Sequence, residues 1–214
     1  MNFAKYVQKN NMRELAGGLL LLISFPVFAH HPMGGVTPQT LSEGLLSGLG
    51  HPIIGVDHLA FLVVAMLLAN ALKGAARFMV PLVFIGTTVA GTIVHLGGVT
   101  IPMSGALVAL TVMLVGMLAL TRHYPGALAV SVIFAVSGIL HGYAYGESII
   151  GAESTPLLAY LAGFAAIQYA LIIAGMFVME KITRKSEAKG ILLARISSVM
   201  ALITGGVFFT LGIV

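Results

Sequence analysis

The sequence predicts an all-α membrane protein with six transmembrane helices after an N-terminal signal peptide. Of its 214 residues, 58% are hydrophobic and only 8% are charged, and the mean hydropathy is +1.04. Apolar stretches close to the roughly 20 residues that cross a bilayer recur along the chain. Every Lys and Arg after residue 29 lies in or beside alternate loops, as expected of cytoplasmic loops. These three observations predict one polytopic membrane domain.

The first 29 residues have the pattern of a secretory signal peptide. Three basic residues precede an apolar core, and Val27-Phe28-Ala29 fits the rule of small residues before the cleavage site. An uncleaved first transmembrane helix is the alternative. Cleavage after Ala29 would expose His30 and His31, whose amine, amide and imidazole nitrogens could chelate Ni(II) or Cu(II) in a plane. Two incidental histidines are the alternative for this terminus.

Residues 30–214 are expected to form the six-helix transmembrane domain. Residues 33–50 are rich in Gly, Ser and Thr with a weak apolar pattern, so we expect a short interfacial or re-entrant helix on the outer side. The spans are expected at about residues 53–72, 78–96, 104–121, 126–142, 156–180 and 191–213. A cleaved signal peptide would leave the N-terminus outside and the basic loops in the cytoplasm.

The stretch His51-Pro52-Ile53-Ile54-Gly55-Val56-Asp57-His58 opens the first expected span with two imidazoles and a carboxylate. If Pro52 occupies the first helical turn, a helix from about residue 53 to 72 follows. His51 and His58 are seven residues apart, so such a helix would place them on one face. Ionisable groups inside a membrane are costly and indicate function. We expect His51, Asp57 and His58 to form the core of a metal site.

The other potential ligands are expected on the same outer side, whereas the cations gather on the inner side. Incidental histidines would not be expected to sort in this way. These further imidazoles and carboxylates belong to His30, His31, His95, His141, Glu147 and Glu153. The chain has no Cys, which excludes thiolate sites, so nitrogen and oxygen ligands favour nickel, cobalt or zinc.

Three glycines spaced four residues apart, Gly138, Gly142 and Gly146, surround His141. Small residues at this spacing let helices approach closely in lipid. We therefore expect the fourth span to pack beside the first and to bring His141 towards His58. Ordinary packing glycine is the alternative interpretation.

The stretch from His51 to His58 resembles the HPxxGxDH motif of the HupE/UreJ family of bacterial nickel and cobalt permeases. All five fixed positions match: His51, Pro52, Gly55, Asp57 and His58. The segment His141-Gly142-Tyr143-Ala144-Tyr145-Gly146-Glu147 is similar to the family's second His/Glu region. The sequence departs from the pattern at Tyr145, near which many members carry a histidine, and near Gly105, where many carry a glutamate.

The resemblance implies a bacterial inner-membrane permease that imports Ni(II) or Co(II), bound transiently as cargo, and not an enzyme. The partners expected are the metal ion, the bilayer and a second copy of the chain in a homo-oligomer, with no nucleic acid. An intramembrane zinc-dependent hydrolase built on the same His/Asp cluster is the alternative, although no HExxH or GxSxG motif is present. Met113 and Met117 could instead bind Cu(I) through their thioether sulfurs, but methionines at this spacing are more often packing residues.

Overall fold

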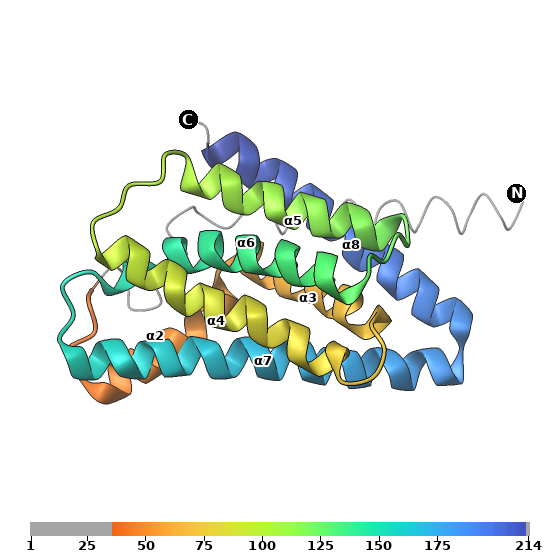
Figure 1. Ribbon diagram of the computed structural model, residues 1–214, viewed down its shortest axis with the longest axis horizontal. Helices are drawn as coiled ribbons and strands as arrows, with labels where there is room; N and C mark the ends of the chain where they lie inside the picture. The colour runs from red at the N-terminus through yellow and green to blue at the C-terminus, as the bar shows by residue number, and fades with distance from the viewer. Residues whose placement is uncertain (1–35, 213–214) are drawn as a thin grey trace, which may run out of the picture. The chain divides into compact units, whose positions relative to one another are not determined.

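The computed structural model describes residues 36–212, which contain seven α-helices and no β-strand (Figure 1). The α-helices are α2 (Leu41–Ile54), α3 (Val56–Ala71), α4 (Ala76–Leu96), α5 (Ser104–Leu120), α6 (Ala127–Gly146), α7 (Ser154–Lys185) and α8 (Glu187–Gly212). A short 3-10 helix, η2 (Glu147–Ile149), follows α6. The all-helical prediction is confirmed for these residues. The expected signal peptide lies outside them.

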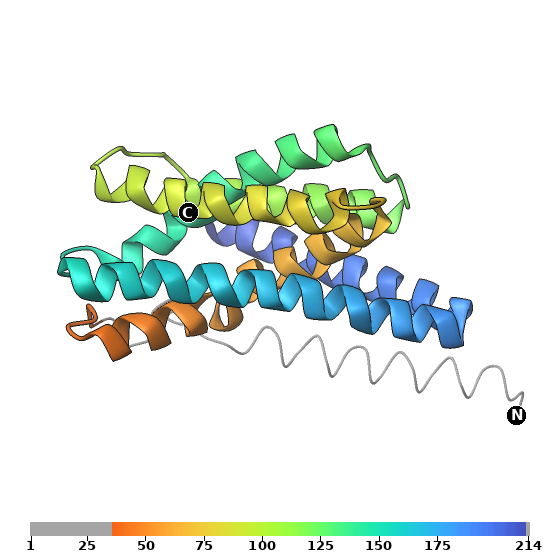
Figure 2. The same cartoon turned by 60° about the horizontal axis from the view of Figure 1, so that its bottom comes forward.

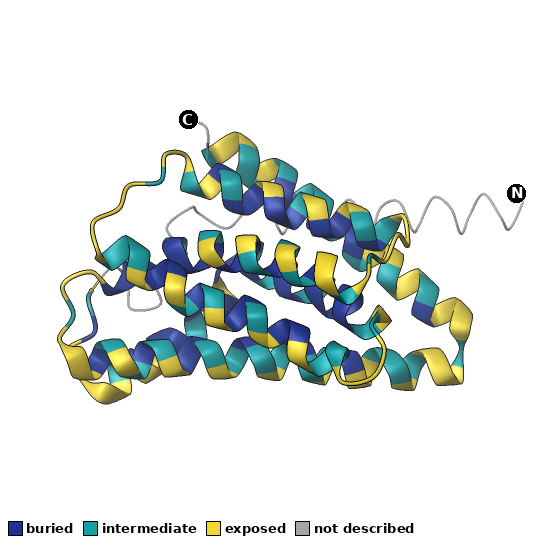
Figure 3. Cartoon of the chain, in the orientation of Figure 1, coloured by how far each residue is buried: buried dark blue, intermediate teal, exposed yellow. Residues whose placement is uncertain are grey.

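Four of the described helices are long and apolar enough to cross a membrane: α4, α6, α7 and α8. Helices α2 and α3 together make a fifth candidate, bent by 73°. Helix α5 is apolar but has only 17 residues, which is shorter than the other candidates. Exposed positions recur along the helices (Figure 3), and they include large apolar residues such as Leu128, which is 81% exposed, and Leu158, which is 66% exposed. The molecule is therefore a membrane protein with four or five candidate spans, and the expected count of six is not confirmed.

The expected continuous helix over residues 53–72 is wrong. Pro52 lies in the last turn of α2, not in the first turn of the following helix. Gly55 adopts an extended conformation (φ −68°, ψ 101°), and α3 starts at Val56. The expected short helix at residues 33–50 is instead α2, which begins after a Thr40–Glu43 capping box and continues to Ile54.

Helix α3 forms the centre of the bundle, and most of its residues are buried (Figure 3). It packs against α5, α8 and α7, and less extensively against α4. Phe61 of α3 stacks on Phe84 of α4, with ring centroids 4.8 Å apart, and both rings approach Phe134 of α6. The polar side chains in the first turn of α3 therefore lie inside the bundle.

Three close helix pairs surround α3, and glycine permits the approach in each. Helix α2 lies along the first half of α7 in both views (Figures 1 and 2), and a Cβ on Gly48 would collide with the α7 backbone. A Cβ on Gly142 of α6 would collide with the α4 backbone, and one on Gly212 of α8 would meet the α5 backbone. Such contacts are typical of helices that associate in lipid.

The glycine face of α6 packs against α4, not against the first span as the sequence suggested. Added Cβ atoms on Gly138, Gly142 and Gly146 would meet Thr87, Thr88 and His95 of α4. Helix α6 contacts α3 only sparsely. His141 nevertheless reaches His58, because its side chain is buried among residues of α3, α4 and α5.

The ends of the bundle differ in charge. The loop at residues 72–75, the loop at 121–126 and the α7–α8 junction lie at one end, and the connections at 97–103 and 147–153 lie at the other (Figure 1). The first end carries the basic residues, among which Arg77 forms an ion pair with Glu180 at 2.8 Å and donates to Asn70 at 2.9 Å. We call this the basic end.

Candidate metal site at the break between two helices

The break at Gly55 brings the ends of α2 and α3 together. The Gly55 N–H donates to the His51 carbonyl at 3.0 Å, and the Gly55 carbonyl accepts from the Leu59 N–H at 2.8 Å. A Cβ on Gly55 would lie 2.6 Å from Cδ2 of His58. The imidazole of His58 therefore folds against the break because residue 55 has no side chain.

Asp57 and His58 occupy the first turn of α3 and are both buried. Asp57 is 5% exposed, and its Oδ1 accepts a hydrogen bond from the His58 backbone N–H at 2.9 Å. A carboxylate in this position is stabilised by the amino-terminal end of the helix dipole. Among the described residues, no Lys or Arg forms an ion pair with Asp57. The backbone N–H of His58 is therefore a direct hydrogen-bond partner of this carboxylate.

His58 contacts a second imidazole from α6. The two Nδ1 atoms of His58 and His141 are 2.8 Å apart. On its other side, His141 Nε2 lies 3.0 Å from Oγ1 of Thr111, and that hydroxyl also lies 2.7 Å from the Val108 carbonyl. A row of hydrogen bonds therefore joins α3, α6 and α5 inside the bundle.

His51, at the end of α2, is linked to α7. Its Nδ1 lies 2.9 Å from the hydroxyl of Tyr160, which also donates to the Tyr145 carbonyl at 2.9 Å. The rings of His51 and His58 are 5.6 Å apart between centroids. Tyr145 packs edge-on against both rings, at 4.7 and 4.5 Å. We call His51, Asp57, His58 and His141 the buried His/Asp cluster.

The remaining predicted ligands are not part of this cluster. His95 packs against Tyr143 with centroids 4.4 Å apart, and its buried Nδ1 has no hydrogen-bond partner among the described residues. Glu147 and Glu153 are exposed in the connection between α6 and α7. His30 and His31 lie outside the described residues. Within residues 36–212, no three His, Asp or Glu side chains are arranged to hold one metal ion.

Sequence reasoning missed Thr111 and Tyr160 as neighbours of the histidines. Both are buried, and both hydrogen-bond an imidazole. A polar residue in an apolar helix was a usable signal for Thr111, because buried hydroxyls need partners. Nothing in the sequence paired Tyr160 with His51, from which it is separated by 109 residues.

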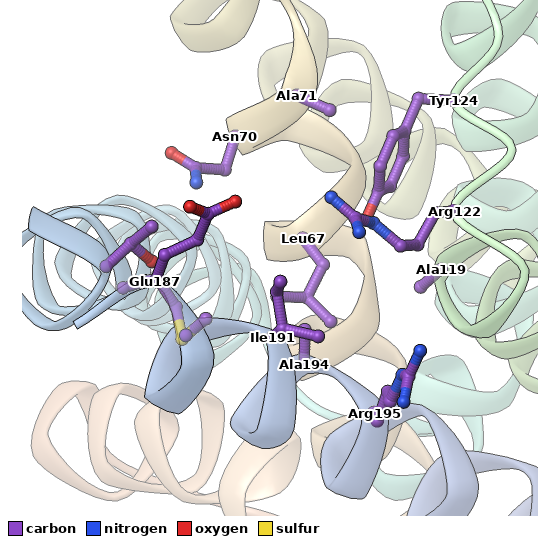
Figure 4. Close-up of a pocket in the computed structure, with 13 residues that line it drawn as sticks. Leu67, Asn70, Ala71, Ala119, Arg122, Tyr124, Glu187, Ile191, Ala194 and Arg195 are labelled. Carbon is purple, nitrogen blue, oxygen red and sulfur yellow. The ribbon is translucent and has the colours of Figure 1, made fainter.

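A cavity of about 230 Å³ lies at the basic end, between α3, the α5–α6 loop, α7 and α8. Arg122 and Tyr124 lie on one side of it, and Arg195 and Glu187 approach from α8 (Figure 4). No histidine lines this cavity. Its two arginines disfavour a divalent cation, so it is unsuited to the role predicted for the buried His/Asp cluster.

Comparisons with known proteins identify the family. The family described as HupE / UreJ protein matches residues 18–208. Protein HupE from Rhizobium leguminosarum bv. viciae is 28% identical over 158 residues, which are 73% of this chain and 78% of that protein. No solved structure matches the chain. The chain therefore belongs to the HupE/UreJ family, whose members are generally nickel or cobalt transporters and not enzymes.

Proposed function

We propose that the protein is a bacterial inner-membrane permease that imports Ni(II), or alternatively Co(II), through an outward-facing site built on His51, Asp57 and His58. The observation that carries this proposal is that His51, Asp57 and His58 are buried on the two sides of a helix break inside an apolar bundle, with the two imidazole rings 5.6 Å apart between centroids. Such groups are expensive to place there and mark ion pathways in membrane proteins.

The chemistry of the cluster suits a borderline divalent cation. Imidazole nitrogen is a favourable ligand for nickel and cobalt, and the buried carboxylate of Asp57 offsets part of the double positive charge. The carboxyl-terminal end of α2 adds partial negative charge at the break, since its last carbonyls point along the helix axis. Transporters commonly use broken helices in this way.

The proposed orientation places the basic end in the cytoplasm, following the positive-inside rule. It requires six crossings, with α2 and α3 as one broken span and α5 as a short one. His95, Glu147 and Glu153 then lie towards the outer side, where they would attract and pass on the hydrated ion. After cleavage of the signal peptide, His30 and His31 would form an N-terminus on the same side that could bind the metal ion.

Uptake of radioactive nickel into proteoliposomes tests the proposal. The purified protein is reconstituted and assayed with and without a proton gradient, alongside His58→Ala and Glu187→Gln, an exposed acid of α8. We expect uptake by the native protein and the Glu187 variant, and none by the His58 variant. Nickel that binds but never crosses the membrane would contradict a permease and would point to a receptor that needs a partner or to an enzyme.

A further inference from the structure

Two hydrogen-bond chains determine where the protons of His51 and His58 lie. Each chain ends on a backbone carbonyl, which can only accept a hydrogen bond. Each also passes through a hydroxyl group that has a single hydrogen to donate. The direction of every bond in the chain follows from these two facts, because hydrogen positions are assigned from the network of partners.

The first chain runs from Val108 to His58. The Thr111 hydroxyl donates its hydrogen to the Val108 carbonyl at 2.7 Å, so its oxygen must accept from His141 Nε2–H at 3.0 Å. A neutral His141 then has a bare Nδ1, which accepts from His58 Nδ1–H at 2.8 Å. A doubly protonated His141 would place a charge on a ring that is 0% exposed, which is costly.

The second chain runs from the Tyr145 carbonyl to His51. The Tyr160 hydroxyl donates to this carbonyl at 2.9 Å, so its oxygen accepts from His51 Nδ1–H at 2.9 Å. His51 and His58 therefore carry their protons on the same ring atom. In the neutral rings this leaves Nε2 of both residues unprotonated, the form in which an imidazole nitrogen binds a metal ion.

We infer that Thr111 and Tyr160 are positioning residues that hold His58 and His51 as Nδ1–H tautomers, so that each presents an unprotonated Nε2 to the metal ion. The metal part of this inference rests on the proposed function; the tautomers themselves do not. Both nitrogens of His141 are engaged, one by His58 and one by Thr111. His141 is thus a positioning residue in this arrangement, and not the direct ligand expected from the sequence.

The metal-free protein tests the tautomers without any mutation. We would label the histidine rings with nitrogen-15 and record their protonation by nuclear magnetic resonance. We expect His51 and His58 to be protonated on Nδ1, and a coupling between the two Nδ1 atoms of His58 and His141 across their hydrogen bond. Protonation of His58 or His51 on Nε2 would overturn the inference, whatever the protein transports.

Thr111→Val tests the positioning role, because valine keeps the shape and removes the acceptor for His141. We expect His58 to lose its uniform Nδ1–H form, because His141 can then donate from its own Nδ1 to His58, and the nickel affinity to fall about 10- to 100-fold, the usual effect of losing such a supporting group. Thr111→Ser should restore both. Tyr160→Phe should cause a similar loss of affinity through His51, with the His58–His141 coupling retained.

The matched control is Thr87→Val, because within residues 36–212 the Thr87 hydroxyl donates only to carbonyls of its own helix, those of Val83 and Phe84. It should change neither the spectrum nor the affinity. An unchanged spectrum in Thr111→Val would overturn the positioning role. If the native protein shows the expected tautomers but binds no nickel, the proposed cargo fails while the proton assignment stands.

Discussion

At Gly55 the missing side chain leaves room for the imidazole of His58. A Cβ there would lie 2.6 Å from His58 Cδ2 and 3.2 Å from the His51 carbonyl oxygen. The sequence indicated that Gly55 belongs to the motif, but not why. The reason is steric, since its φ of −68° is open to any residue.

We predict that Gly55→Ala displaces the His58 ring and abolishes high-affinity nickel binding, at a cost of about 1–3 kcal/mol in stability. Nickel titration and thermal unfolding of the purified variant would measure the two effects. Gly86→Ala is the control, because nothing lies within 4 Å of a Cβ at that helical position. Normal nickel affinity in the Gly55 variant would show that the His58 ring can accommodate a Cβ at residue 55, and would contradict the steric explanation.

Asp57→Asn separates the charge of the side chain from its structural role. The amide oxygen of asparagine can still accept from the His58 N–H, a bond of 2.9 Å in the native protein. We expect the variant to fold and insert normally, while nickel uptake falls at least tenfold because the compensating negative charge is lost. Retained uptake, measured in proteoliposomes, would exclude the carboxylate from the ion-binding step.

At the scale of the element, α6 shows how one helix serves two purposes. Its glycines pack against α4, while His141 points to α3 and α5. The four-residue spacing predicted a close helix contact correctly, but it could not identify the partner, because any helix backbone can approach a glycine face. The broken span was missed for a similar reason: Pro52 is compatible with the first turn of one helix and with the last turn of another.

We predict that Gly142→Ala destabilises the protein by about 3 kcal/mol, the upper end for overpacking, because the added methyl group collides with the Thr88 carbonyl. Thermal unfolding in detergent would measure the loss. Gly86→Ala, on the partner helix α4 and without neighbours at the Cβ position, should be neutral or slightly stabilising, because alanine favours a helix more than glycine does. Equal unfolding temperatures for the two variants would mean that α4 and α6 can shift apart to admit the methyl group at little cost in stability.

At the scale of the whole molecule, charge divides the bundle into two ends. The sorting of Lys and Arg into alternate loops was visible in the sequence, and the structure places those loops together at the basic end (Figure 1). The interior was harder to foresee. His58 meets His141 and His51 meets Tyr160 through contacts between residues far apart in the chain, which local patterns do not specify.

Because the sequence contains no cysteine, single introduced cysteines can report the orientation of the protein in the membrane. Single cysteines at Ile150 and Lys189, both exposed, flank the helix α7. We predict that a membrane-impermeant maleimide labels Ile150→Cys in intact cells and labels Lys189→Cys only after the membrane is opened. The reverse pattern would invert the proposed orientation. Labelling of both in intact cells would show that α7 does not cross the membrane.

The pairing of α2 with α7 also has a consequence for biosynthesis. The hydrogen bond between His51 and Tyr160 spans 109 residues, so the ribosome must make four further helices before α7 emerges. At roughly 5–20 residues per second, this takes about 5–20 s. During that interval His51 lacks its α7 partner. The growing chain therefore passes most of its synthesis without the His51–Tyr160 hydrogen bond and can form it only after α7 has been made.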